Sequence, residues 1–231
     1  MQDRIDEFVA LGTDLNRIRV QIAEQAANKS GRVIDFEKQY LLGLRDWHSR
    51  RPMAEEVLEN VLSSAILDIG LTMRPIGSME VQFPPVDFRF GEPPHLLAIS
   101  PRDRIELTQT FLLKQQMSVG EMEELERAVL EKYNMAGLVV RLGGVATYPA
   151  LIEIPSSLDA ALFLGAHEWA HHYLWFYPLG QSYFSDGHMT TINETLADLV
   201  AKEIGRMAYD RLSGESGPQE VSIDIAQDNQ G

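Results

Sequence analysis

The sequence predicts an α+β fold in which N-terminal helices, a small and mostly antiparallel sheet, and two C-terminal helices share one core. Helical periodicity of apolar residues extends to Gly70, short strand-like runs fill 79–154, and a nearly continuous apolar segment starts at Leu158. With 231 residues and 45% hydrophobic content, the chain is long and apolar enough to bury such a core. We therefore divide it into an N-terminal helical region, a larger domain and a polar tail, at residues 1–72, 73–212 and 213–231.

Three helices are expected in the N-terminal region. The first covers 2–28, where apolar residues recur every three or four positions: Ile5, Phe8, Leu11, Leu15, Ile18, Ile22 and Ala26. This stripe is narrow and its flanks are charged, so the helix either packs on the core or binds a partner as a coiled-coil arm. The second helix spans 33–47, and the third begins at Pro52, a favourable first helical position. Arg50 and Arg51 are expected in the solvated turn between them.

Short strands and one amphipathic helix are expected between Gly70 and Leu158. The strands are expected at Met79–Phe83, Val86–Phe90, Leu96–Ile99, Ile105–Leu113, Gly137–Leu142 and Tyr148–Ile154, and the helix at Ser118–Tyr133. Gly143 and Gly144 are expected to form a turn. Because Pro149 cannot donate to a sheet ladder, we expect the last strand at a sheet edge, where its free backbone groups could pair with an extended peptide.

A buried helix is expected from Leu158 to Phe176. Ser156 and Ser157 precede it as candidate N-caps, and nearly all of its residues are apolar. The exceptions are His167, Glu168, His171 and His172. Burial of these groups would cost several kcal/mol unless they are paired or bind a metal ion. A bound metal ion is the simplest explanation for their presence in this helix.

The spacing of these residues suits zinc. On a helix, positions i and i+4 share one face, so His167 and His171 can bind one Zn²⁺ while Glu168 faces a water molecule. Hydrolytic zinc sites combine neutral imidazole ligands, an open position for water and a base within reach of its proton. We therefore predict that His167 and His171 bind zinc and that Glu168 is the general base.

A second motif, Asn-Glu-Thr-Leu-Ala-Asp, supplies further candidates at positions 193–198. Glu194 is suited to be the third zinc ligand, because catalytic zinc sites commonly have three protein ligands. Asp198 lies one helical turn further on, where it can accept the free ring N–H of a zinc-bound histidine. An alternative is that Glu194 forms a capping box with Thr191 at the start of this helix.

The segment around these two motifs contains a polar loop and a helix. The loop is expected at Tyr177–Thr191 and could shape a pocket. The helix is expected at Ile192–Leu212. Its apolar side is expected to hold Ile192, Leu196 and Leu199, and its other side Glu194, Asp198 and Ala201.

The paired motifs resemble those of the gluzincin zinc metallopeptidases, in which His-Glu-x-x-His is followed on a later helix by a Glu ligand and then an Asp. The Asn-Glu-x-x-x-Asp form looks like the thermolysin-type members, and Glu-x-x-Ala-Asp also looks like the CAAX-prenyl endopeptidases. The resemblance covers roughly residues 145–210, under a third of the chain. It implies a zincin-like domain, one Zn²⁺ and a peptide or protein substrate.

One part of the thermolysin-type pattern is missing. Those enzymes stabilise the oxyanion with a histidine beyond the third ligand, and this chain has no histidine after His188. Tyr183, His188 or Arg206 could take that role. Because of this gap, a catalytically weak or inactive zincin-fold module for binding or sensing remains the alternative to a peptidase. A structural zinc site is disfavoured because such sites are normally closed by four protein ligands.

Composition excludes several other classes. The net charge of −14 argues against nucleic acid or an anionic membrane surface as the main partner. Cysteine is absent, so neither disulfides nor thiolate ligands can form, and the chain fits any compartment. No apolar run reaches about 18 residues, the length needed for a membrane span. No signal peptide is apparent, and the chain could be a soluble domain of a longer, membrane-anchored protein.

Overall fold

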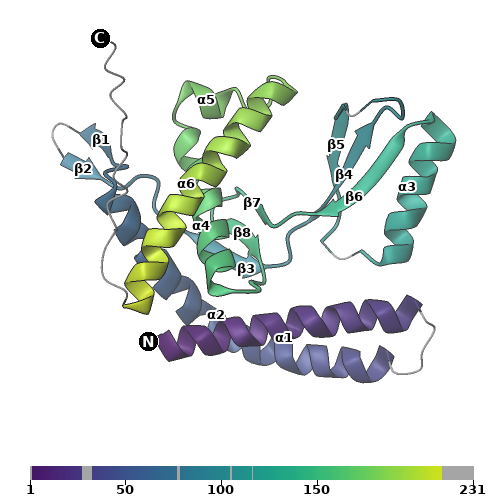
Figure 1. The fold of residues 1–231 in the computed structure, drawn as a ribbon, viewed down its shortest axis with the longest axis horizontal. Helices are drawn as coiled ribbons and strands as arrows, with labels where there is room; N and C mark the ends of the chain where they lie inside the picture. The colour runs from purple at the N-terminus through teal and green to yellow at the C-terminus, as the bar shows by residue number, and fades with distance from the viewer. Residues whose placement is uncertain (1, 28–32, 77–78, 105, 116, 215–231) are drawn as a thin grey trace, which may run out of the picture.

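The computed structural model describes residues 2–27, 33–76, 79–104, 106–115 and 117–214, and within them the fold is α+β, as predicted. The helices α1 (Gln2–Ala27) and α2 (Val33–Asp68) lie side by side (Figure 1). Their apolar faces meet the main core, which contains Phe8, Trp47 and Leu58. The rings of Phe8 and Trp47 stack with centroids 5.0 Å apart. The first helix therefore packs on the core.

The helix α2 is continuous, so the predicted turn at Arg50 and Arg51 is wrong. Pro52 lies inside the helix and removes one intrahelical hydrogen bond. Fully buried residues on both sides of it, Trp47 and Ala54, anchor the helix to the core and outweigh this local preference. Arg51 also has tertiary partners, since its guanidinium donates to the Phe90 carbonyl oxygen over 3.2 Å.

The strands form three small sheets instead of one. In the first, β1 (Met73–Ile76) pairs with β2 (Met79–Val81). In the second, β8 (Ala150–Glu153) lies between β3 (Phe88–Gly91), which is parallel to it, and β7 (Gly144–Val145), which is antiparallel. In the third, β4 (His95–Ser100) lies between β5 (Gln109–Leu112) and β6 (Ala136–Arg141), all antiparallel.

Two predictions about the second sheet are therefore wrong. The strand expected at Tyr148–Ile154 is central, not an edge, because Pro149 precedes β8 and leaves the ladder intact. The Ala150 N–H donates to the Asp87 carbonyl oxygen over 2.9 Å, which continues the pairing with β3. Gly144, expected in a turn, begins the outer strand β7.

The other outer strand of this sheet, β3, is covered by α2. Glu59 Oε1 accepts the Phe88 N–H over 2.9 Å, and Glu55 Oε1 accepts the Phe90 N–H over 2.7 Å. These carboxylates replace the neighbouring strand that an edge lacks. Consequently β7 alone carries the sheet's uncovered edge, on the side of the molecule where α4 and α6 lie (Figure 1).

The third sheet and helix α3 (Val119–Tyr133) form a separate unit, which we call the wing (Figure 1). Its small core contains Leu97, Val129 and Val139. Ser118 caps α3 in a capping box with Glu121, so the predicted start of this helix is confirmed. The predicted strand at Ile105–Leu113 shortens to β5, and Ile105 lies outside the described residues.

Three helices complete the fold: α4 (Leu158–Leu174), α5 (Pro178–Gln181) and α6 (Gly187–Ser213). Ser157 caps α4, as predicted. Asp186 caps α6, so this helix begins before the predicted Ile192 and Thr191 lies within its first turns. The capping box of Thr191 with Glu194 is therefore contradicted. The short helix α5 lies within the segment predicted as a loop.

The buried face of α6 differs from the predicted one. Its fully buried residues are mostly small and include Ala197, Ala201 and Ala208, whereas Ile192 and Leu199 are exposed. Gly205 lies against the backbone of α4, since a Cβ there would be 3.5 Å from the Phe163 nitrogen. Small side chains allow α4 and α6 to approach closely, and this approach determines which residues meet across the two helices.

Candidate metal centre

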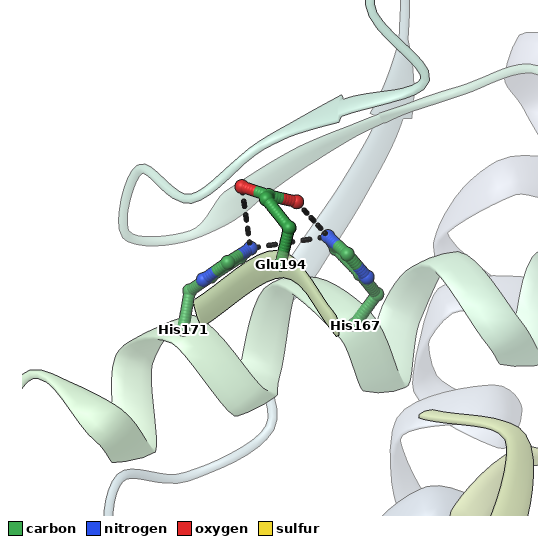
Figure 2. Close-up of side chains that lie close together, drawn as sticks. All are labelled: His167, His171 and Glu194. Carbon is green, nitrogen blue, oxygen red and sulfur yellow. Dashed lines mark hydrogen bonds and ion pairs between the residues drawn. The ribbon is translucent and has the colours of Figure 1, made fainter. Parts of the chain in front are cut away.

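Three side chains from α4 and α6 converge, as Figure 2 shows. The Nε2 atoms of His167 and His171 are 3.0 Å apart. Glu194 Oε2 lies 3.3 Å from His167 Nε2, and Glu194 Oε1 lies 3.5 Å from His171 Nε2. The predicted ligand set is therefore assembled in space, although Glu194 lies on a different helix and 23 positions after His171 in the sequence.

These separations fit a zinc ion. Two ligands bound tetrahedrally to zinc at about 2.0–2.1 Å lie roughly 3.3 Å from each other. The three observed separations, 3.0, 3.3 and 3.5 Å, surround that value. Two imidazole Nε2 atoms that face each other also need a shared proton or a cation between them. The chemistry of the donor set and its spacing are thus both suitable for zinc.

The charges at the site are strongly coupled. Hydrogen bonds from His167 and His171 hold the pKa of Glu194 far below its usual range, despite burial. Burial lowers the pKa of His167, but the hydrogen bond to Glu194 and the nearby carboxylates outweigh it, so the net shift is upward. The site therefore attracts positive charge, which either protons or a metal cation can supply.

Glu168 is buried beside these ligands, with 5% of its surface exposed. Burial raises its pKa to about 7, against the opposing influence of His167 and His171. The backbone of β7 approaches it closely, because a Cβ added at Gly144 would lie 2.1 Å from Glu168 Oε1. Only glycine fits at this position without moving the carboxylate. A pKa near neutrality and a fixed position are what a general base requires.

Asp198 lies one turn beyond Glu194 on α6, next to the second nitrogen of His167. Its Oδ1 atom is 3.0 Å from His167 Nδ1. The contact is an ion pair and not a hydrogen bond. No other acceptor among the described residues bonds to this buried nitrogen. Asp198 is thus the group placed to orient His167.

Tyr183 is the candidate oxyanion donor that the fold brings to the site. Its hydroxyl donates to Glu194 Oε1, and its ring lies edge-on to His171 with centroids 5.7 Å apart. Burial and Glu194 raise its pKa, so the hydroxyl keeps its proton. The Thr190 hydroxyl donates to the Tyr183 carbonyl oxygen over 2.7 Å and holds the loop in place.

The other two candidate oxyanion donors, His188 and Arg206, do not lie beside the three predicted ligands. His188 is exposed in the first turn of α6. Arg206 lies 12 residues beyond Glu194 and pairs with Glu203 and Asp210. Among the described residues, neither contacts the three predicted ligands.

Two supporting residues were not identified as such from the sequence. Gly144 was expected in a turn, and nothing local indicates that it faces Glu168 across the fold. Asn193 is buried and donates to the carbonyl oxygens of Leu179 and Met189, both over 2.9 Å. It therefore joins α6 to α5. The sequence feature that could have indicated this role is the position of Asn193 directly before Glu194, the predicted third ligand.

Comparison of the chain with protein-family models, curated proteins and solved structures gives no match. The gluzincin resemblance therefore rests on the motif residues alone. In the part of the chain that the structure describes, no helix is both long enough and apolar enough to cross a membrane.

Proposed function

We propose that this protein is a zinc-dependent metallopeptidase with a zincin-like catalytic unit. The observation that carries the proposal is the convergence of His167, His171 and Glu194 at zinc-ligand separations, with Glu168 buried beside them. Three ligands leave a coordination position open for water, as catalytic zinc sites do.

Zinc bound by these residues would supply a Lewis acid for the scissile carbonyl and acidify the attacking water. Glu168 takes the proton from this water and delivers it to the leaving amine. Asp198 holds the His167 ring in position through Nδ1. Of the three predicted donors, the Tyr183 hydroxyl, which keeps its proton, is the one beside the site and would donate to the developing oxyanion once it turns from Glu194.

The substrate in this proposal is an extended peptide that pairs with the uncovered edge of β7. This strand is outermost in its sheet, and its Gly144 lies against Glu168. A peptide paired there would run past the general base, and backbone hydrogen bonds would hold it regardless of its sequence. The peptide is therefore expected to pair with β7 and not with β8, the strand expected from the sequence.

The second candidate function is a zinc-binding module that does not hydrolyse peptides. It is favoured by one observation: the only donor beside the site among the predicted candidates, Tyr183, already donates to Glu194. If that bond persists when zinc and peptide are bound, the oxyanion lacks a donor.

Metal removal and a peptide-library digest separate the two functions. The zinc-loaded protein is expected to cleave peptides, the chelator-treated protein to lose this activity, and added zinc to restore it. A Tyr183→Phe variant that keeps its zinc but cleaves more slowly would assign the oxyanion role. Stoichiometric zinc without any cleavage across the library would favour the binding module.

A further inference from the structure

The outer strands of the two three-stranded sheets differ in how their free edges are protected. On β3, carboxylates of α2 accept the backbone N–H groups. On β6, Glu126 Oε1 of α3 accepts the Val139 N–H over 2.8 Å. On β5, all four residues are exposed, and no group among the described residues bonds to the outward backbone of Thr110 or Leu112.

The outward direction follows from the pairing with β4. The Leu113 N–H donates to the His95 carbonyl oxygen over 2.8 Å, so this pair points inward. In an antiparallel ladder, hydrogen-bonded pairs alternate with unbonded ones. Phe111 and Gln109 therefore bond to β4, whereas Thr110 and Leu112 direct their N–H and carbonyl groups to the open edge. These groups are available to another strand.

Strand β5 itself also lacks the usual devices against strand pairing. The sequence from 107 to 113, Leu-Thr-Gln-Thr-Phe-Leu-Leu, contains no charge and no proline. Natural edge strands normally carry one or the other, because an open uncharged edge joins further strands. An edge of this kind in a stable protein is expected to be covered.

We propose that β5 pairs with β5 of a second copy of this chain, antiparallel, about a twofold axis. Such an interface uses the same surface on both copies, so β5 must be complementary to itself. A chain with a net charge of −14 repels its own copies over most of its surface, and β5 is an uncharged exception. The charged side chains that flank β5, Glu106 and Lys114, are paired with Arg104 and Glu121 of the same chain, so they do not favour a peptide of particular charge.

The best register centres on Phe111. Thr110 of each copy then pairs with Leu112 of the other, and both pairs exchange backbone hydrogen bonds. Phe111 meets Phe111 of the second copy in an unbonded pair, the closest type of cross-strand contact. Phe111 is 49% exposed on the face that bears α3, and Leu112 is 64% exposed on the other face. Pairing would cover both side chains and join the two wings into one continuous sheet.

The absence of cysteine makes a direct test possible, because one introduced thiol reports one contact. In the proposed register the two Phe111 Cα atoms are about 4.5 Å apart, within the range that a disulfide spans. Mild oxidation of Phe111→Cys is expected to give a disulfide-linked dimer at least about tenfold faster than oxidation of Leu138→Cys. Leu138 is a matched control, 58% exposed on β6 of the same sheet.

Sedimentation measures the oligomeric state of the unmodified protein. At micromolar concentration the protein is expected to have twice the mass of one chain. Thr110→Pro, which removes an outward N–H without touching the bonds to β4, is expected to shift the protein to monomer with an unchanged circular dichroism spectrum. A wild-type monomer, equal cross-linking at both cysteines, or a dimer that survives Thr110→Pro would each overturn the proposal. A monomer that binds an added peptide through β5 would assign the edge to a different partner.

Discussion

Carboxylates lie in two partly buried regions of this molecule, and their surroundings give them opposite properties. At the α2–β3 contact, Glu59 accepts a backbone N–H, and burial raises its pKa to about 7. At the candidate metal centre, hydrogen bonds from two imidazoles hold the pKa of Glu194 far below its usual range. A half-buried carboxylate that accepts a backbone N–H supports the fold, whereas one that faces two histidines attracts positive charge.

The largest effect is expected at the candidate metal centre, from Glu168→Gln. The glutamine amide has the same shape as the carboxylate but cannot accept a proton. The variant should therefore keep its zinc and lose hydrolysis. A drop of about 10²–10⁴-fold in kcat is typical for a lost general base. Activity and zinc content are measured together; undiminished hydrolysis would remove Glu168 from the mechanism.

Gly144→Ala tests the position of the base without changing its chemistry. The added Cβ would lie 2.1 Å from Glu168 Oε1, so the carboxylate must move. Displacement of a catalytic group by about 1 Å can cost on the order of 10²-fold in rate. Zinc affinity should stay unchanged, since no ligand is touched. Gly120→Ala, at a position with nothing within 4 Å, is the control.

A smaller effect is expected from Asp198→Asn. The variant keeps the shape of the side chain but removes the charge beside His167 Nδ1. Loss of such a partner typically reduces metal affinity or activity by about 10–100-fold. Chelator competition measures the affinity; an unchanged value would mean that Asp198 is only a surface residue of α6.

The smallest effect is expected at the α2–β3 contact, and it concerns stability. Glu59 has a folded pKa of about 7, above its ordinary 4.5, so it stabilises the fold below pH 4.5 and this contribution is lost as pH rises through 7. Glu59→Gln still offers an oxygen to Phe88 and should lose this pH dependence. The difference should be about 1–2 kcal/mol between pH 5 and 8, because solvent screens a half-buried group.

Denaturant unfolding at several pH values measures this difference. Glu56→Gln, an exposed neighbour on α2, is the control. Parallel stability curves for wild type and Glu59→Gln would contradict the role of ionisation at this contact.

Local patterns predicted most of the helices and the side chains that converge between α4 and α6, because helical spacing alone brings His167 and His171 to one face. The same patterns could not place β8, whose central position depends on pairing with β3, about 60 residues earlier. The buried face of α6 was also missed. Hydrophobicity favoured Ile192 and Leu199, but close packing on α4 selected alanines and glycine. The role of Gly144 could not be predicted either, because its contact with Glu168 depends on the pairing of β7 with β8.

The zinc content of the purified protein tests the central claim most directly. Mass spectrometry of the metal is expected to give about one Zn²⁺ per chain for wild type and for His188→Ala, whose histidine is exposed and away from the site. His171→Ala, which removes one of the three converging ligands, is expected to bind zinc far more weakly and to be purified nearly free of it. Equal zinc in His171→Ala and wild type would contradict the assignment of this site.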